Sequence, residues 1–283
     1  MNVSGNSPAR KLVYWGSHYL MIGAFVVFAL FPLYWLLKVS VTPNDILYTE
    51  GVRMWPSRTT WENYFFVLTQ SNFPHYFLNS VIVAGTTAIV TTMVAAVTGY
   101  SFSRFAFRGK VIIVALMLIT QMFPLVMLIA PIFKILAPLG LTDSLTGLII
   151  VYTAFNVPFA TFLMQSFFDG IPKDLEEAAM IDGNTRFQAF RRIILSLTLP
   201  GVAATLGFVF TAAWSELLFA LMLVSSESAS TFPVGLLSFV SKFSVDFGQM
   251  MAAGVLALIP ACAFFLLIQR YLVQGLTAGA VKG

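Results

Sequence analysis

The chain has 283 residues, of which 58% are hydrophobic and only 10% are charged, and its mean hydropathy is +0.86. Soluble domains usually carry about 25% charged residues, so this composition excludes an ordinary soluble domain and indicates an integral membrane protein. The net charge of +4 is not gathered into a Lys/Arg tract, and the single cysteine, Cys262, excludes a disulfide framework. We therefore expect positive charges that lie beside anionic membrane lipid and bind no nucleic acid.

A polar segment, residues 1–14, precedes the first long apolar stretch and is predicted to be cytoplasmic. Arg10 and Lys11 stand just before that stretch. The stretch is too long for the apolar region of a signal peptide and lacks a convincing cleavage site, so we expect an uncleaved first span.

Six stretches are long enough to cross a membrane, and none contains Asp, Glu, Lys or Arg. Because hydrocarbon offers no hydrogen-bond partners, each backbone amide must be satisfied within its own segment, and these stretches are expected to be helices. Prolines inside them predict kinks or locally opened backbone. The sequence thus predicts an all-α membrane protein with a transmembrane domain of residues 15–273. The expected spans are residues 15–37, 77–103, 111–133, 144–168, 193–215 (extended to about 224) and 247–269.

Lys and Arg residues set the expected orientation. With a cytoplasmic N-terminus, most of the 16 Lys and Arg residues fall on the inner side, which is the usual bias. Both termini, including a tail of residues 274–283, are therefore predicted to be cytoplasmic. The outer side then receives residues 39–76, a tight turn of residues 134–143, and a Ser-rich segment of residues 225–246 that we expect to be flexible.

A charged insert separates the fourth and fifth apolar stretches, in a predicted cytoplasmic loop of residues 170–192. Pro172 suits the first turn of a helix. Glu176 and Glu177 favour the positive end of a helix, and the alanines that follow them let another surface approach its backbone closely. Gly183 suits the left-handed position that ends a helix.

Thr185, with Gln188 three residues later, predicts a capping box that opens a second helix. The loop is therefore expected to form helix, sharp turn and helix, a knob spanning residues 172–190. Arg186, Arg191 and Arg192 are expected to hold the second helix at the lipid–water boundary. Physics alone leaves an alternative open, in which the charged loop lies on the bilayer without a protein partner.

The order of residues in this insert resembles the Glu-Ala-Ala loop in the membrane subunits of binding-protein-dependent ABC carbohydrate importers. That pattern runs Glu-Ala-Ala, Asp-Gly, Phe-x-x-Ile and Leu-Pro. A first Leu-Pro usual in the family is Leu195-Ser196 here, which predicts a straighter helix into the fifth span. The matching residues are Glu177-Ala178-Ala179, Asp182-Gly183, Phe190 to Ile193, and Leu199-Pro200.

The resemblance implies the type I ABC importer permease fold, in a bacterial cytoplasmic (inner) membrane. It implies as partners a second permease subunit, expected as a heterodimer, two copies of a cytoplasmic ABC ATPase, and an external or periplasmic sugar-binding protein, besides membrane lipid. The function implied is half of a translocation pathway for a sugar or oligosaccharide. The residues implied to couple to the ATPase are Glu176, Glu177, Ala178, Ala179, Asp182, Gly183 and Arg186.

Two further segments resemble the family. The end of the chain is similar to the tail of maltose-importer permeases, which implies ATPase contacts by Gly275, Thr277, Gly279 and Lys282. The Ser-rich outer segment is implied to meet the binding protein through Ser228, Ser230 and Pro233.

No phosphate-binding Gly-x-x-x-x-Gly-Lys-Ser/Thr loop is present in the sequence, so we expect no enzyme activity, with ATP hydrolysis on a partner chain. The sequence also predicts no metal site and no cofactor. Glu216, with Trp214, is a candidate pathway residue, because an ionisable group in a span is functional by default. The alternative is a carboxylate hydrogen-bonded for structure near the outer surface. An ion-coupled secondary transporter and a non-transporting membrane assembly protein remain alternative functions.

Overall fold

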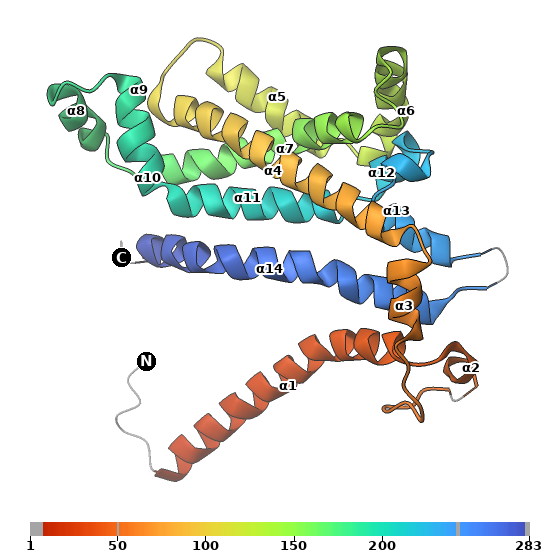
Figure 1. Ribbon diagram of the computed structural model, residues 1–283. Helices are drawn as coiled ribbons and strands as arrows, with labels where there is room; N and C mark the ends of the chain where they lie inside the picture. Colours follow the sequence, from red (N-terminus) through yellow and green to blue (C-terminus); the bar gives the residue numbers. More distant parts are fainter. Residues whose placement is uncertain (1–7, 50, 242–243, 281–283) are drawn as a thin grey trace. The chain divides into compact units, whose positions relative to one another are not determined.

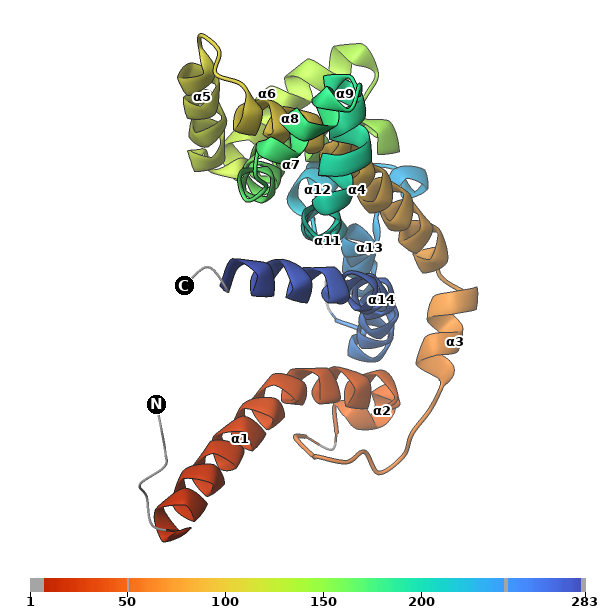
Figure 2. The ribbon, with the colours of Figure 1, turned by 90° about the vertical axis from the view of Figure 1, so that its left-hand side faces the viewer.

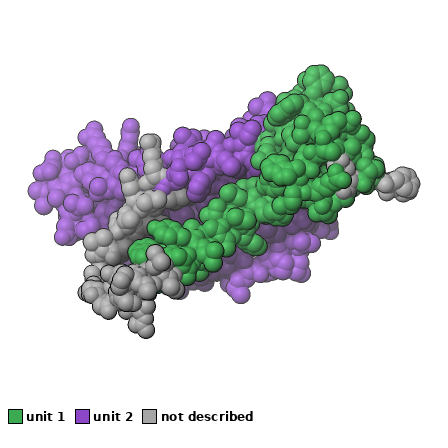
Figure 3. Space-filling model, turned by 90° about the horizontal axis from the view of Figure 1, so that it is seen from below, with its two compact units in different colours: residues 1–71, 239–256 green, residues 72–238, 257–283 purple. Residues whose placement is uncertain are grey.

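The computed structural model describes residues 8–49, 51–241 and 244–280, and the chain divides into two compact units. The first comprises residues 1–71 and 239–256, and the second residues 72–238 and 257–283 (Figure 3). Side chains are described for residues 14–49, 51–241, 244–269 and 271. Among the described residues, four helices are long and apolar enough to cross a membrane, or up to six if each of two bent helix pairs is one span.

The first unit contains α1 (Pro8–Ser40), α2 (Asn44–Leu47), α3 (Glu62–Thr69) and the beginning of α14 (Phe247–Ala280) (Figure 1). Residues 39–76, which are expected on the outer side, contain the short helices α2 and α3. Asn63 fixes this segment, because its buried amide donates to the carbonyls of Ser40 and Thr42 at 3.0 and 3.1 Å.

The second unit is built on α4 (Phe73–Arg104), α7 (Leu145–Asp169) and α11 (Leu199–Trp214), which pack side by side (Figure 1). Small residues let these helices approach, as is usual inside membranes. A Cβ at Gly99 would stand only 2.9 Å from the backbone nitrogen of Gln165 and 3.0 Å from the carbonyl oxygen of Thr161. A larger residue at position 99 would therefore push α4 away from α7.

The third apolar stretch is not one helix. It forms α5 (Lys110–Met122) and α6 (Leu125–Leu136), which are bent by 106° at the break between them. Phe123 is extended, as the residue before a proline prefers, and Pro124 cannot donate a helical hydrogen bond. The helix expected over residues 111–133 is interrupted at Pro124, which agrees with the kink or locally opened backbone that its prolines predict.

The fifth stretch is also broken. A helix formed by α9 (Arg186–Ala189), a π-helical turn at Phe190–Ile194 and α10 (Leu195–Leu197) meets α11 at an angle of 74°. The expectation of a straighter entry, drawn from Leu195-Ser196, was wrong. Pro200 lies in the first turn of α11 and has no amide to donate, and Thr198 ends the preceding turn by donating its hydroxyl to the Ile194 carbonyl at 2.9 Å.

The extension expected beyond residue 215 is a separate helix, α12 (Leu218–Leu223). The outer segment that follows contains short helical pieces. They are η3 (Glu227–Ala229), α13 (Phe232–Leu236) and η4 (Leu237–Phe239). One 3₁₀ turn, η1 (Ala137–Leu139), precedes α7.

Candidate functional site

The knob has the predicted local structure. Its first helix, α8 (Asp174–Ile181), has acidic residues in its first turn. Pro172 lies just ahead of the helix, not inside its first turn as expected. Gly183 has φ +89°, the left-handed conformation predicted for it. Thr185 and Gln188 form the predicted capping box, in which the Thr185 amide donates to Gln188 Oε1 at 2.8 Å.

A buried ion pair attaches the knob to α4. Glu176 is 6% exposed and accepts hydrogen bonds from the Tyr100 hydroxyl at 2.9 Å and from Arg104 Nε. Arg104 also donates from Nη2 to the Ile171 carbonyl at 3.0 Å, just ahead of α8. Because each charged group has hydrogen-bond partners, this pair satisfies the condition for burying charge. Figures 1 and 2 place α8 and α9 at the end of the second unit where α4 ends.

Aromatic rings support the same attachment. The Tyr100 ring centroid lies 4.4 Å from that of Phe190 and 5.7 Å from that of Phe168. The Arg186 guanidinium stacks over the Phe105 ring at 5.1 Å from its centroid, a favourable cation–π position. The knob is thus packed on the ends of α4 and α7, which indicates a rigid mount.

The predicted coupling residues divide between two faces of the knob. Glu176 and Ala179 are buried inside the subunit. The others are exposed, namely Glu177, Ala178, Asp182, Gly183 and Arg186.

Two apolar side chains on the exposed face were missed by the sequence analysis. Ile181 is 86% exposed and Phe187 is 68% exposed, on either side of the Gly183 turn. Bulky apolar residues within a charged loop outside the spans were a signal available in the sequence. An exposed apolar surface beside carboxylates is suited to bind a second protein.

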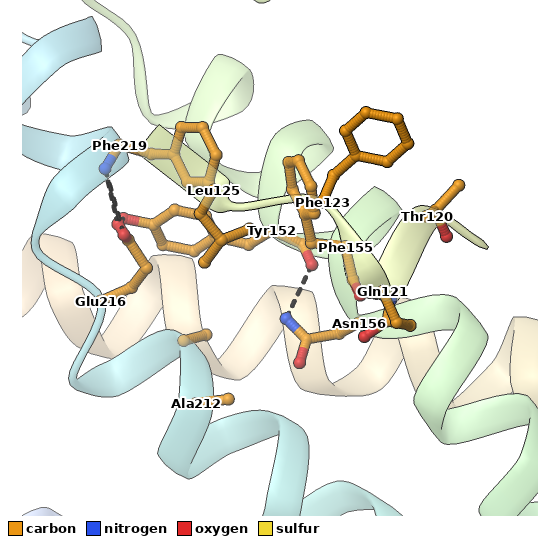
Figure 4. Close-up of a pocket in the computed structure, with 11 residues that line it drawn as sticks. Thr120, Gln121, Phe123, Leu125, Tyr152, Phe155, Asn156, Ala212, Glu216 and Phe219 are labelled. Atoms are coloured by element: carbon orange, nitrogen blue, oxygen red, sulfur yellow. Dashed lines mark hydrogen bonds between the residues drawn. The ribbon is translucent and has the colours of Figure 1, made fainter. Parts of the chain in front are cut away.

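A pocket of about 290 Å³ lies at the break between α5 and α6 (Figure 4). It combines amide side chains with aromatic rings. Gln121 donates to the Phe155 carbonyl at 3.2 Å, and Asn156 donates to the Tyr152 carbonyl at 2.8 Å. The pocket is lined by Thr120, Gln121, Phe123, Leu125, Tyr152, Phe155, Asn156, Ala212, Ala213, Glu216 and Phe219.

Glu216 lines this pocket, but its carboxylate is engaged. It accepts hydrogen bonds from the Tyr152 hydroxyl at 2.7 Å and from the Phe219 and Ala220 amides at 3.0 and 3.3 Å, at the start of α12 (Figure 4). These contacts agree with the structural alternative for Glu216. Trp214 is 4% exposed and packs elsewhere, with its ring 4.6 Å from Phe232.

The outer segment is more ordered than the expected flexible loop. Asn79 of α4 donates to the carbonyls of Ser228 and Ser230 at 3.0 and 2.9 Å, and Ser80 accepts from the Phe232 amide at 2.8 Å. Ser230 is 9% exposed and Pro233 is buried, whereas the Ser228 side chain is exposed. Of the three residues predicted to meet an external protein, only Ser228 has an exposed side chain.

Asp143 ties the short outer turn to the same segment. Its Oδ1 accepts from the Ser225 and Ser226 amides at 2.9 and 2.8 Å and from the Ser226 hydroxyl at 2.9 Å. These hydrogen bonds stabilise the ionised carboxylate and lower the pKa of Asp143 below its usual value. The backbone hydrogen bond from Ser226 has the largest effect, followed by that from Ser225. Because these hydrogen bonds favour the ionised carboxylate, protonation of Asp143 weakens the anchor.

Among the described residues, no group of three or more His, Cys, Asp or Glu side chains is placed to hold a metal ion. At the C-terminal end, α14 continues to Ala280. Gly275, Thr277 and Gly279 lie on this helix, where side chains are not described, and Lys282 lies outside the described residues.

Residues 92–278 match the family described as "Binding-protein-dependent transport system inner membrane component". The chain is 35% identical over 278 residues to the trehalose transport system permease protein SugB of Mycobacterium tuberculosis, covering 97% of this chain and 99% of that protein. It is 36% identical over 269 residues to the trehalose/maltose transport system permease protein MalG of Thermococcus litoralis, covering 93% of this chain and 96% of that protein.

A solved structure has the same fold. It is a chain of a bacterial ABC transporter involved in the import of the acidic polysaccharide alginate. The TM-score is 0.81 at 20% identity, and the match covers 94% of this chain and 99% of that chain. This likeness confirms the predicted importer permease fold.

Proposed function

The chain belongs to the family of binding-protein-dependent transport system inner membrane components, and from that membership we propose that it couples sugar import to a separate ATPase through its knob. It is a multi-pass permease subunit of a sugar ABC importer in the inner membrane. In the proposed complex, the chain forms one half of a heterodimeric pathway, with two ATPase copies on the cytoplasmic side and a sugar-binding protein on the outer side.

The observation that supports coupling is the two-sided construction of the knob. One face of the knob is attached to α4 by the buried pair of Glu176 and Arg104. The opposite, exposed face carries Ile181, Phe187 and the acidic Glu177. The apolar side chains fit a groove on the ATPase, and Glu177 meets a cation at the rim of that groove. Glu176 acts by holding the knob, not by touching the ATPase.

A rigid knob transmits displacement. When the ATPases close on ATP, they push the knob. The helices α4 and α7 move with it, because the aromatic contacts and the buried ion pair keep the knob attached to them. The permease then changes between two packed arrangements, inward-open and outward-open, whose populations are set by nucleotide on one side and loaded binding protein on the other.

The substrate is a sugar or oligosaccharide. The pocket at the break between α5 and α6 offers what a sugar needs in a pathway. Phe123 and Phe155 supply rings that cover the apolar face of a pyranose, and the amides of Gln121 and Asn156 supply polar atoms for hydroxyl groups. The Glu216 carboxylate is engaged by hydrogen bonds from Tyr152, Phe219 and Ala220. It therefore lends no support to an ion-coupled secondary transporter.

On the outer side, Ser228 is the contact for the binding protein. Its side chain is exposed, and its backbone carbonyl accepts a hydrogen bond from Asn79 of α4, so α4 positions the contact. In a background with Cys262→Ser, a cysteine at Ser228 should cross-link to the binding protein in the ATP-bound state. A cysteine at the buried Ser230 is the matched control and should not. Equal yields, or none at Ser228 in any nucleotide state, would assign the segment another role.

The tail, residues 274–283, couples nucleotide state to the permease in addition to the knob. Deleting residues 277–283 should preserve membrane insertion and assembly but lower sugar-stimulated ATP hydrolysis and uptake together. Wild-type rates for the truncated complex would show that the tail is dispensable.

The function as a whole is tested by purifying the chain with its partners and reconstituting the complex in liposomes. We expect an ATPase and a second permease to co-purify, and ATP hydrolysis to rise when binding protein is added with one saccharide of a panel. Transport that proceeds without nucleotide and follows an ion gradient would contradict the proposal.

A further inference from the structure

The connection between α2 and α3 exposes an apolar surface in the first unit. Within residues 52–55, the 52–55 loop, Val52 is 88% exposed, Met54 56% and Trp55 76%. Figure 1 shows this connection beside the C-terminal end of α1. Bulky apolar side chains exposed together mark a place where a protein meets another protein or a membrane. Neither the coupling knob nor the sugar pocket uses this surface.

The 52–55 loop is packed on α1. The Tyr34 hydroxyl donates to the Met54 carbonyl. The Trp55 ring meets the Tyr34 ring edge-on, with the two centroids 5.7 Å apart. Since α1 contains a candidate membrane span, Tyr14–Ser40, the depth of the loop relative to the bilayer follows from the depth of Tyr34 on that span.

Aromatic residues mark both ends of the span in α1. Tyr14 and Trp15 stand at its start, and their rings contact each other. Tyr34 and Trp35 follow 20 residues later, roughly 30 Å along the helix, which is the hydrocarbon thickness of a typical bilayer. Trp and Tyr gather at both membrane–water interfaces, and Lys38 follows with its amine 4.8 Å from the centre of the Trp35 ring, as a cation does at that boundary. Tyr34 therefore lies at the outer interface.

We propose that the 52–55 loop inserts into the headgroup region of the outer leaflet, with Val52 and Trp55 in contact with lipid. A docking site for a soluble binding protein would stand above the headgroups, whereas contact with Tyr34 holds this loop at their depth. Trp suits that depth, because its ring is apolar and its indole N–H donates to headgroups and water.

The side chains of the loop also favour lipid over a second membrane subunit. Contacts between spanning subunits are enriched in small residues that let backbones approach closely, whereas this loop presents bulky side chains. Lipid bound here fixes the depth of the outer end of α1. This inference rests on the membrane location of the chain and is independent of the coupling role of the knob.

The test measures the depth of the loop in the assembled complex, reconstituted in liposomes. In a background with Cys262→Ser, a nitroxide is attached to a cysteine at Val52. Its collisions with oxygen, which partitions into lipid, are compared with its collisions with a water-soluble nickel chelate. Oxygen should dominate at Val52. A cysteine at Glu62, an exposed acidic position at the start of α3, is the matched control, where the nickel chelate should dominate.

Two tryptophan variants separate insertion from exposure alone. Trp55→Ser removes the ring that packs on Tyr34 and should lower the ratio of oxygen to nickel collisions at Val52. Trp61 is almost as exposed, at 73%, but its ring packs on Tyr64 of α3 with centroids 5.5 Å apart. Trp61→Ser should therefore leave the ratio unchanged, and equal shifts in the two variants would overturn the proposal.

The wild-type label separates the other possible occupants of this surface. Dominant nickel collisions at Val52 would show a loop that faces water and would overturn the proposal. Few collisions with either reagent would overturn it too, and would assign the loop to the second permease. Nickel collisions that are lost only when the binding protein is added would make the loop a docking site for that protein instead.

Discussion

The knob and the outer segment both contact α4, but through different chemical groups. On the knob side, a buried carboxylate, Glu176, is locked to a buried guanidinium and a ring cluster. On the outer side, Asn79 and the exposed Asp143 hold backbone amides and carbonyls of residues 225–230. Breaking a buried charge pair is expensive, and the Asn79 amide is also buried, whereas the hydrogen bonds of the exposed Asp143 are easily exchanged with water. The knob is therefore attached through a buried ion pair, whereas the outer segment combines one buried neutral anchor with one exposed charged anchor.

The largest effect is expected at the buried pair. Glu176→Gln leaves the Arg104 charge buried without its partner and should destabilise the knob by about 3–5 kcal/mol. Sugar uptake should fall to background although the chain remains in the membrane. The measurement is uptake together with limited proteolysis of the 172–190 loop, which should become readily cleaved.

A double variant sharpens this prediction. Replacing Arg104 together with Glu176, by Met and Gln, removes both charges and should restore part of the proteolytic resistance. A double variant as sensitive as Glu176→Gln alone would show that the ion pair is not what holds the knob.

The exposed face of the knob should respond differently. Glu177→Lys reverses a surface charge and should leave proteolytic resistance unchanged, yet abolish uptake because the ATPase no longer docks. Gly183→Val forces a β-branched residue to φ +89° and should distort the turn at a cost of about 1–2 kcal/mol, with loss of uptake. Normal uptake by both variants would remove the knob from the coupling mechanism.

A smaller effect is expected on the outer side. Asn79→Ala removes the donor to the Ser228 and Ser230 carbonyls and should cost about 1–3 kcal/mol of local stability. ATPase co-purification should be unaffected, whereas stimulation by the binding protein should fall. Hydrogen exchange of residues 225–232 measures the first effect, and ATP hydrolysis the second. Unchanged exchange would show that α4 does not position the segment.

The smallest effect is pH-dependent. Because the pKa of Asp143 is lowered in the folded chain, its contribution is complete above the ordinary carboxyl pKa of 3.8 and is lost as pH falls through the lower folded value. The unfolding temperature of the wild type should thus fall by a small amount as the pH is lowered through this acid range, because the contribution of Asp143 to stability is lost. Asp143→Asn should lack that fall, and identical acid sensitivity of the two proteins would contradict the assignment.

The same comparison explains what sequence could predict. The Gly183 turn and the capping box of Thr185 and Gln188 follow from rules that act within a few residues, and both were predicted correctly. The partner of Glu176 lies 72 residues away on α4, and no local rule reports it. The choice between a kink and a break in the third stretch could not be made from sequence, because a proline in a membrane helix is compatible with either. The order of the outer segment depends on Asn79, which its own composition does not reveal.

The most direct test of the account places a photo-cross-linking amino acid at Ile181, the most exposed apolar position of the knob at 86%. Leu139 is the matched control, an apolar residue 64% exposed in the turn predicted to face outward. In the assembled complex, Ile181 should cross-link to the ATPase in high yield and Leu139 should not. Failure of Ile181 to reach the ATPase in every nucleotide state would contradict the claim that the knob is the coupling element.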